Sequence, residues 1–425
     1  MRRLAAAAVA VLLGATLLTG ATVSPDPVEA DTPDDLIDPV RGLEYWLEDY
    51  GVSEAWETTR GAGVTIAVID TGIARGPVEL DPAVIGGTDV SGLGSADGRT
   101  PVGAVDASHG SWVASLAAAR GTGPDSGMIG VAPEADLLSV SVGFGSSAAV
   151  PFVEQVAEGI RWSVDNGADI INLSFTTNTT DWDKSWDSAF QYAFDNDVVV
   201  IVAAGNRGSG TSTVGAPATI PGVLTVAGVD PEGTASVEAS TQGITLGVAA
   251  PSEKLLGVSA DGAVVQWDGT SGAAPIVAGI AALVRSAHPD LDANNVINRL
   301  IRTATPAKGS SVLYGYGLVD AEGAVEASVP VVSANPMGSL EEWIRIYRRA
   351  DAGPVAEPTV EPVEIEALPP AESLTRDDSP LLPTRETLLY GTVPLVMLSS
   401  VAILVALGVT AAVRRIRSAS RTPSR

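Results

Sequence analysis

The chain has 425 residues with 25 basic and 51 acidic side chains, two histidines and no cysteine, and its formal net charge is −26. The absence of cysteine excludes disulfide bonds and thiol catalysis. Without the arginines at the two ends, the segment from Asp26 to Glu386 carries a net charge of about −33, which disfavours nucleic acid and anionic lipid as its partners.

The N-terminus has the pattern of a secretory signal. Two arginines follow the initiator methionine, and an uncharged apolar run then extends from Leu4 to Leu18. Small residues permit cleavage after Ala21 or Ala30. The run is short for a membrane span and is followed by acidic, proline-containing sequence, so we expect residues 1–30 to be a cleaved signal peptide.

Residues 31–60 form the next predicted segment, an N-terminal extension. After signal cleavage about 40 to 50 residues precede Asp70, too few for a folded inhibitory prodomain. The run from Leu43 to Val52 instead predicts a short lead into the main domain.

The first chemically informative element ends at Asp70. The run from Val64 to Ile69 is rich in β-branched residues and predicts a buried strand. Gly72 permits a turn that directs the Asp70 carboxylate out of the sheet. This carboxylate is therefore a candidate to orient an imidazole.

His109 begins the segment HGSWVASLAAA at a predicted junction of loop and helix. The other histidine, His288, precedes Pro289 near the predicted end of a helix, where an imidazolium suits the helix dipole. We therefore assign His288 a structural role and His109 the role of candidate base.

Two further motifs supply a hydroxyl and an amide. A buried strand from Val198 runs into a loop at Asn206. Ser271 precedes small residues and Pro275, which is tolerated in the first turn of a helix, so its hydroxyl is predicted at a helix N-terminus.

These residue types fit nucleophilic catalysis. A serine hydroxyl is a weak nucleophile until a base takes its proton, and the base needs a third group to fix its tautomer. Asp70, His109 and Ser271 therefore predict a catalytic triad. The Asn206 amide and the Ser271 backbone N–H are the predicted donors to the oxyanion of a tetrahedral intermediate.

No cluster of histidine or cysteine indicates a metal site, and no cofactor is assigned. Acidic loops containing Asp181 and Asp183, or Asp261, are candidates for calcium. Ordinary solvated charge is the alternative interpretation for these loops, and the sequence leaves calcium open.

The C-terminal part predicts a tether and a membrane anchor. Repeated prolines and acids indicate a semi-extended tether over residues 331–386, in which 340–349 would form one short helix that docks on the domain or lies at an interface. Residues 388–413 contain no charge and are long enough to span a bilayer. The arginines of residues 414–425 place this tail in the cytoplasm and the catalytic domain outside.

The motifs resemble those of the subtilisin-like serine proteases (subtilases) between Trp46 and Val329. DTG, HGSWVA, GVAPEA, AAGN and GTSGAAP occur in that family's order. The resemblance implies a serine endopeptidase acting on proteins or peptides. Its catalytic domain, residues 61–330, would be a three-layer α/β fold with a mainly parallel, doubly wound sheet and the active site at the carboxyl ends of the strands. It also implies that Leu173, Ser174 and Gly205 bind substrate.

Two segments depart from the family's pattern. Ser111 and Ser115 replace a threonine and a helix-packing glycine, and we expect Ser111 to keep the local hydroxyl bonds. Phe175, Thr176 and Thr177 stand where the family commonly has a glycine pair in the segment that lines the specificity pocket. Added side chains narrow or reshape a pocket, so broad digestive specificity is disfavoured.

The order of segments resembles the mycosins, membrane-anchored subtilases associated with type VII secretion in actinobacteria, although this chain lacks their usual cysteines. The resemblance implies limited processing linked to the type VII secretion machinery. Two alternatives are a surface-anchored degradative subtilase and a structural subunit of the secretion apparatus with dispensable catalysis.

Overall fold

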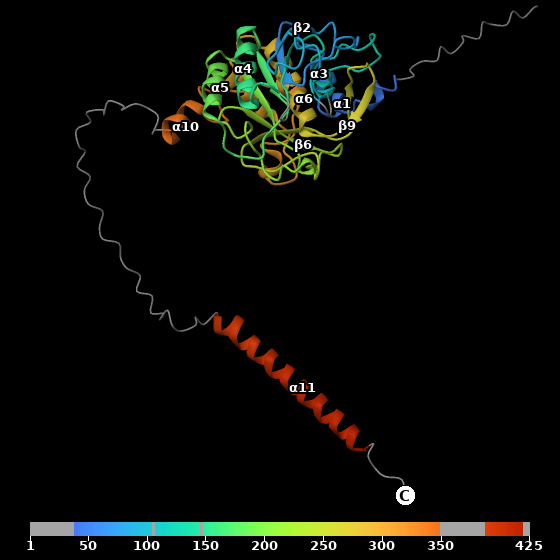
Figure 1. Ribbon diagram of the computed structural model, residues 1–425, viewed down its shortest axis with the longest axis vertical. Helices are drawn as coiled ribbons and strands as arrows, with labels where there is room; N and C mark the ends of the chain where they lie inside the picture. Colours follow the sequence, from blue (N-terminus) through green and yellow to red (C-terminus); the bar gives the residue numbers. More distant parts are fainter. Residues whose placement is uncertain (1–37, 104–106, 145–147, 349–386, 420–425) are drawn as a thin grey trace, which may run out of the picture. The chain divides into compact units, whose positions relative to one another are not determined.

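A computed structural model describes residues 38–103, 107–144, 148–348 and 387–419 (Figure 1). The expected signal peptide, residues 1–30, lies outside the described residues. The chain divides into two compact units, with residues 38–348 in the first and 387–419 in the second, and each is described by itself.

A seven-stranded parallel sheet forms the centre of the first unit, in the order β2-β3-β1-β4-β5-β6-β7. Because the strands are parallel, their carboxyl ends meet at one edge, where α/β enzymes place their sites. The strands are β1 (Thr65–Asp70), β2 (Val84–Asp89), β3 (Asp136–Ser141), β4 (Ile170–Leu173), β5 (Val199–Ala203), β6 (Leu224–Val229) and β7 (Leu246–Pro251). A separate antiparallel hairpin joins β8 (Leu255–Val258) to β9 (Val264–Trp267).

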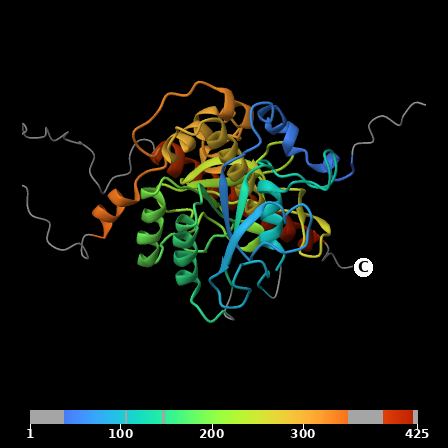
Figure 2. The ribbon, with the colours of Figure 1, turned by 90° about the horizontal axis from the view of Figure 1, so that it is seen from above.

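Helices cover both faces of this sheet and complete the expected three-layer α/β fold. Ile69 and Asp70 are neighbours in β1 and so point to opposite faces. Ile69 packs at Gly159 of α4, whereas Asp70 bonds to His109 of α3. Helices α4 and α5 pack together, as do α3 and α6, and Figure 2 shows α4 and α5 side by side in green. The helices are α3 (His109–Ala118), α4 (Phe152–Asp165), α5 (Lys184–Asp195), α6 (Thr270–Ala287), α7 (Ala293–Thr303), α8 (Ser311–Tyr314), α9 (Ala321–Glu326) and α10 (Leu340–Tyr347).

The N-terminal extension is an integral part of the domain from residue 38 onward. It forms α1 (Trp46–Asp49) and α2 (Val52–Ala55). Trp46, Val52 and Ala55 are fully buried in the main core. Removing this segment would therefore expose core side chains.

The boundary expected at residue 330 falls too early, because residues 331–348 are folded on the domain. The Asn295 and Asn298 side chains donate to the carbonyls of Val332 and Pro330 at 3.1 and 2.9 Å. Leu340, the first residue of α10, is buried. Side-chain amides thus hold a segment whose composition resembles a linker, and only residues 349–386 of the expected tether lie outside the described residues.

The second unit is dominated by one long apolar helix, α11 (Val393–Ala419), preceded by a short π-helical turn (Thr387–Thr392). Within residues 388–415, an 18-residue window has a mean hydropathy of 2.4, and none of that window is buried. Helix α6 is also apolar enough to span, but it is buried in the core of the first unit. The C-terminal helix is therefore the candidate membrane span.

Candidate active site

Asp70 and His109 form the first half of the site at the carboxyl edge of the sheet. Asp70 ends β1 and is fully buried, and its Oδ1 lies 2.8 Å from Nδ1 of His109, the first residue of α3. When Nδ1 carries the proton, it donates to this carboxylate and presents Nε2 as the base. Asp70 Oδ1 also accepts a hydrogen bond from the Thr71 backbone at 2.7 Å.

Thr71 positions the start of α3 against the end of β1. Its hydroxyl accepts from Gly110 N at 2.8 Å and donates to Ala107 O at 2.9 Å. One side chain thus binds the backbone on both sides of His109. His109 is consequently held through the backbone of its neighbours as well as through its ring.

Ser271 stands in the first turn of α6, as the sequence predicted, and is held against the end of β4. Its hydroxyl donates to Ser174 O at 2.9 Å, and the Ser174 hydroxyl donates to Ser271 O at 2.7 Å. The Asn172 side chain in turn donates to the Ser174 hydroxyl at 2.9 Å. This reciprocal pair fixes the serine at the same edge of the sheet as Asp70.

The amide of Asn206 has a defined orientation. Its Oδ1 accepts from both the backbone N–H and the hydroxyl of Thr270, each at 2.9 Å. The Nδ2 donor is therefore directed away from Thr270. The Thr270 hydroxyl also accepts from Gly205 N at 3.0 Å, so it braces the loop that carries Asn206.

Two N–H donors lie close to Gly269. A Cβ placed on Gly269 would lie 3.0 Å from Asn206 Nδ2 and 3.7 Å from Ser271 N. A side chain at this position would therefore crowd both donors, and glycine avoids this. Two neighbouring N–H donors next to a nucleophile are the groups that can stabilise a developing oxyanion.

Two tryptophans that the sequence analysis missed pack on the candidate base. The His109 ring lies 5.5 Å from Trp267 and 6.2 Å from Trp112, in both cases edge to face. Trp267 is fixed by a hydrogen bond to Leu256 O, and Trp112 by one to Ser259 Oγ. Trp267 ends β9 two residues before Gly269. This closeness in sequence to the serine motif could have predicted that Trp267 lies at the site.

Residues 174–183, here called the pocket-wall segment, lead away from Ser174 and carry the residues expected to reshape the pocket. Phe175 contacts Phe144 and Phe152 at ring distances of 5.6 and 5.2 Å. The Thr176 hydroxyl donates to Gly215 O at 3.0 Å. Side chains and local bonds thus occupy the space that a glycine pair would leave open.

The three residues expected to bind substrate differ in their surroundings. Leu173 is fully buried in β4, so its side chain belongs to the core and the expectation of a substrate contact is not supported. Ser174 contacts Ser271 directly. Gly205 has a φ of +103°, and a Cβ there would lie 2.6 Å from Thr176 Cγ2, which explains the requirement for glycine.

The remaining polar residues singled out in the sequence have local structural partners. The Ser111 hydroxyl accepts from Ala74 N at 2.9 Å, the local bond expected of it. His288 caps α6, with Nε2 2.6 Å from Val325 O. Asp183 caps α5 through Ser185 N, and Asp261 accepts from Ala263 N. Within the described ranges no group of three or more His, Cys, Asp or Glu side chains could hold a metal ion.

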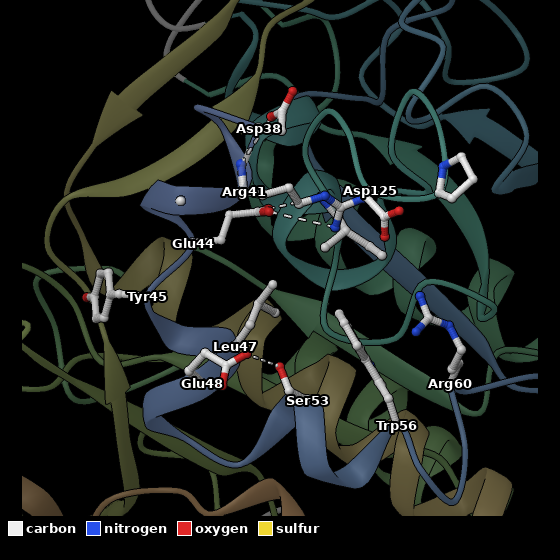
Figure 3. Close-up of a pocket in the computed structure, with 13 residues that line it drawn as sticks. Asp38, Arg41, Glu44, Tyr45, Leu47, Glu48, Ser53, Trp56, Arg60 and Asp125 are labelled. Atoms are coloured by element: carbon white, nitrogen blue, oxygen red, sulfur yellow. Dashed lines mark hydrogen bonds and ion pairs between the residues drawn. The ribbon is translucent and has the colours of Figure 1, made fainter. Parts of the chain in front are cut away.

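A separate cavity of about 830 Å³ lies between the N-terminal extension and the loop around Asp125 (Figure 3). Glu44 lines it with a fully buried side chain, whose Oε1 accepts from Ile129 N at 2.9 Å and whose Oε2 lacks a hydrogen bond. Burial raises the pKa of Glu44 from 4.5 to about 8, against the lowering effects of that bond and of Arg41. None of the catalytic candidates lines this cavity.

The comparisons agree with this geometry. The model of the Peptidase S8 (subtilase) family matches residues 61–317. Subtilisin DY of Bacillus licheniformis is 36% identical over 271 residues, which are 63% of this chain and 92% of that protein.

Two mycosins are also similar. Mycosin-4 of Mycobacterium tuberculosis (strain ATCC 25618 / H37Rv) is 33% identical over 348 residues, covering 71% of this chain and 74% of its own. A solved structure of the MycP3 protease from the type VII (ESX-3) secretion system aligns with a TM-score of 0.56 and 33% identity, covering 67% of this chain and 88% of that one.

Proposed function

Because the chain belongs to the subtilase family and is a mycosin-like serine endopeptidase, we propose that Asp70, His109 and Ser271 are its catalytic triad. Ser271 Oγ attacks the peptide carbonyl while His109 takes its proton. His109 then protonates the leaving amine, and a water molecule activated by the same imidazole releases the acyl group. Asp70 holds the imidazole in the required tautomer throughout.

The observation that carries this assignment is the pair of N–H donors close to Gly269. Asn206 Nδ2 and Ser271 N both lie near this glycine, beside the serine. An oxyanion that accepts from both donors would be stabilised more strongly than the ground-state carbonyl, which is how such donors accelerate acyl transfer.

The proposal extends to location. An apolar helix at residues 388–413, the arginines that follow it and the signal pattern at the N-terminus support a membrane anchor with the catalytic domain outside the cytoplasm. The tether beyond residue 348 would keep the enzyme at the membrane while allowing it to reach exported proteins.

We further propose limited processing linked to type VII secretion. The crowded pocket-wall segment supports narrow specificity. The similarity to mycosins and to a protease of a type VII system supports the link to secretion.

The test compares a deletion strain complemented with wild-type protein or with Ser271→Ala. Mass spectrometry of the N-termini of exported proteins should show a few cleavage products that require the serine. Widespread products would support the degradative alternative. Secretion that fails in the deletion strain but is fully restored by Ser271→Ala, with no serine-dependent product, would instead support a structural subunit.

A further inference from the structure

Helix α10 is held on the domain by a stack of aromatic and cationic groups. The rings of Trp343 in α10 and Trp182 lie 4.4 Å apart at 38°. The Arg348 guanidinium lies 5.3 Å from the Trp343 ring centre and 5.8 Å from that of Trp182. Figure 1 shows α10, in orange, beside α5. We call Trp343 and Arg348 the C-terminal clamp.

Asp187 of α5 completes the contact. Its Oδ2 pairs with Arg348 Nε at 2.7 Å, and both side chains are about 15% exposed. Its Oδ1 accepts from the Trp182 indole at 2.7 Å. An ion pair at this depth is less screened than a surface pair, and the stacked rings add cation–π attraction. These contacts therefore stabilise the packing of α10 against α5 more than an exposed ion pair would.

The clamp binds the far end of the pocket-wall segment. Arg348 Nη2 donates to the backbone carbonyl of Trp182 at 3.2 Å, in addition to its contact with the ring. Arg348 therefore restrains both the main chain and the side chain of Trp182. Displacement of α10 would release both restraints.

Between Trp182 and the candidate active site, the pocket-wall segment is tied to the neighbouring loop. Thr177 N donates to Ala216 O, and Ala216 N donates to Thr179 O, each at 2.7 Å. The Thr219 hydroxyl donates to Thr180 O at 2.8 Å. Together with the bonds between Ser174 and Ser271, these contacts restrain the pocket-wall segment at several points between the clamp and the nucleophile.

We propose that Trp343 and Arg348 are positioning residues that fix the pocket-wall segment for substrate binding. This inference rests on the proposed assignment of Ser174 and its neighbours to the substrate site. Both residues lie beyond the stretch 61–317 matched by the family model, so they add a C-terminal restraint to the protease domain. They contact neither Asp70 nor His109 in the interactions described, so the clamp should govern binding of extended substrates rather than bond cleavage.

The test uses the full-length protein in detergent with an extended peptide substrate. Arg348→Ala should raise KM about 10-fold and change kcat less than about twofold, because the mutation loosens the pocket wall and leaves the reacting groups intact. Labelling of Ser271 by a small sulfonyl fluoride should keep its wild-type rate, because that reagent does not occupy the extended wall. Arg345→Ala is the matched control, since Arg345 pairs with Glu342 of the same helix, and it should leave KM unchanged.

Trp343→Ala should raise KM similarly, and the double variant should not exceed the larger single effect, because both residues act on the same contact. Trp343→Phe, which keeps an aromatic ring, should restore most of the affinity. Thermal unfolding measured in parallel establishes that each variant is folded.

Two results would contradict the positioning role of Trp343 and Arg348. One is an unchanged KM in folded Arg348→Ala, and the other is equal losses of kcat and of Ser271 labelling in that variant. If either result is found while Ser271→Ala is inactive, the positioning role is wrong but the proposed triad still holds. Full activity of Ser271→Ala would instead refute the proposed triad.

Discussion

Glu44→Gln provides a sensitive test of the packing of the N-terminal extension. The Glu44 carboxyl is fully buried, and Arg41 Nη1 lies 3.8 Å away. Burial raises its pKa from 4.5 to about 8. The folded state therefore retains a proton that the unfolded chain releases between these two pH values.

The expected stability follows from this difference. Stability falls as pH rises wherever the folded state binds more protons than the unfolded one, so the loss begins near pH 4.5 and is complete above about pH 8. The separation of the two pKa values corresponds to about 5 kcal/mol at the alkaline end. Glutamine keeps an acceptor for Ile129 N and cannot ionise. Glu44→Gln should thus match wild type near pH 4.5 and exceed it by several kcal/mol at about pH 8.

Urea unfolding of the detergent-solubilised protein, followed by tryptophan fluorescence at several pH values from about 4.5 to about 8, measures this difference. Glu48→Gln is the matched control, because Glu48 lines the same cavity but is exposed and bonds to the Ser53 hydroxyl. If the stability of wild type and of Glu44→Gln changed with pH in parallel, burial would not hold the Glu44 carboxyl in its protonated form.

Further predictions concern the oxyanion donors and topology. Gly269→Ala should lower kcat on the order of 100-fold, because the methyl group would lie 3.0 Å from Asn206 Nδ2 and displace this donor, and because alanine is strained at a φ of +149°. An unchanged kcat in the folded variant would contradict the assignment of these donors to the oxyanion. Asn206→Ala should also cost on the order of 100-fold in kcat with little change in KM, and a mainly KM effect would make Asn206 a substrate-positioning residue. Protease added to intact cells stripped of their wall should remove the catalytic domain and spare an epitope placed after Arg425; loss of that epitope would show the topology to be wrong.

The sequence predicted those parts of the site that short motifs specify locally. The strand ending at Asp70 and the helix starts at His109 and Ser271 each depend on a few adjacent residues, and the structure has them at the expected positions. Parallel strand order then brings their ends to one edge.

Features that depend on distant partners were not predictable in this way. The proline-containing stretch that begins at residue 330 has the composition of a linker, yet the side-chain amides of Asn295 and Asn298 donate hydrogen bonds to its carbonyls. Leu173 was expected at the substrate, but its place in a strand covered on both faces buries it. The short helix at 340–349 was anticipated, whereas its stacking on Trp182 required the fold to bring together residues far apart in the chain.

Labelling of the nucleophile tests most directly whether Ser271 is activated by His109. Reaction of the full-length protein with a fluorophosphonate, followed by proteolytic digestion and mass spectrometry, identifies the modified residue. We expect one adduct, on Ser271, which is lost in Ser271→Ala and forms much more slowly in His109→Ala. An adduct on another serine that persists in Ser271→Ala would contradict it.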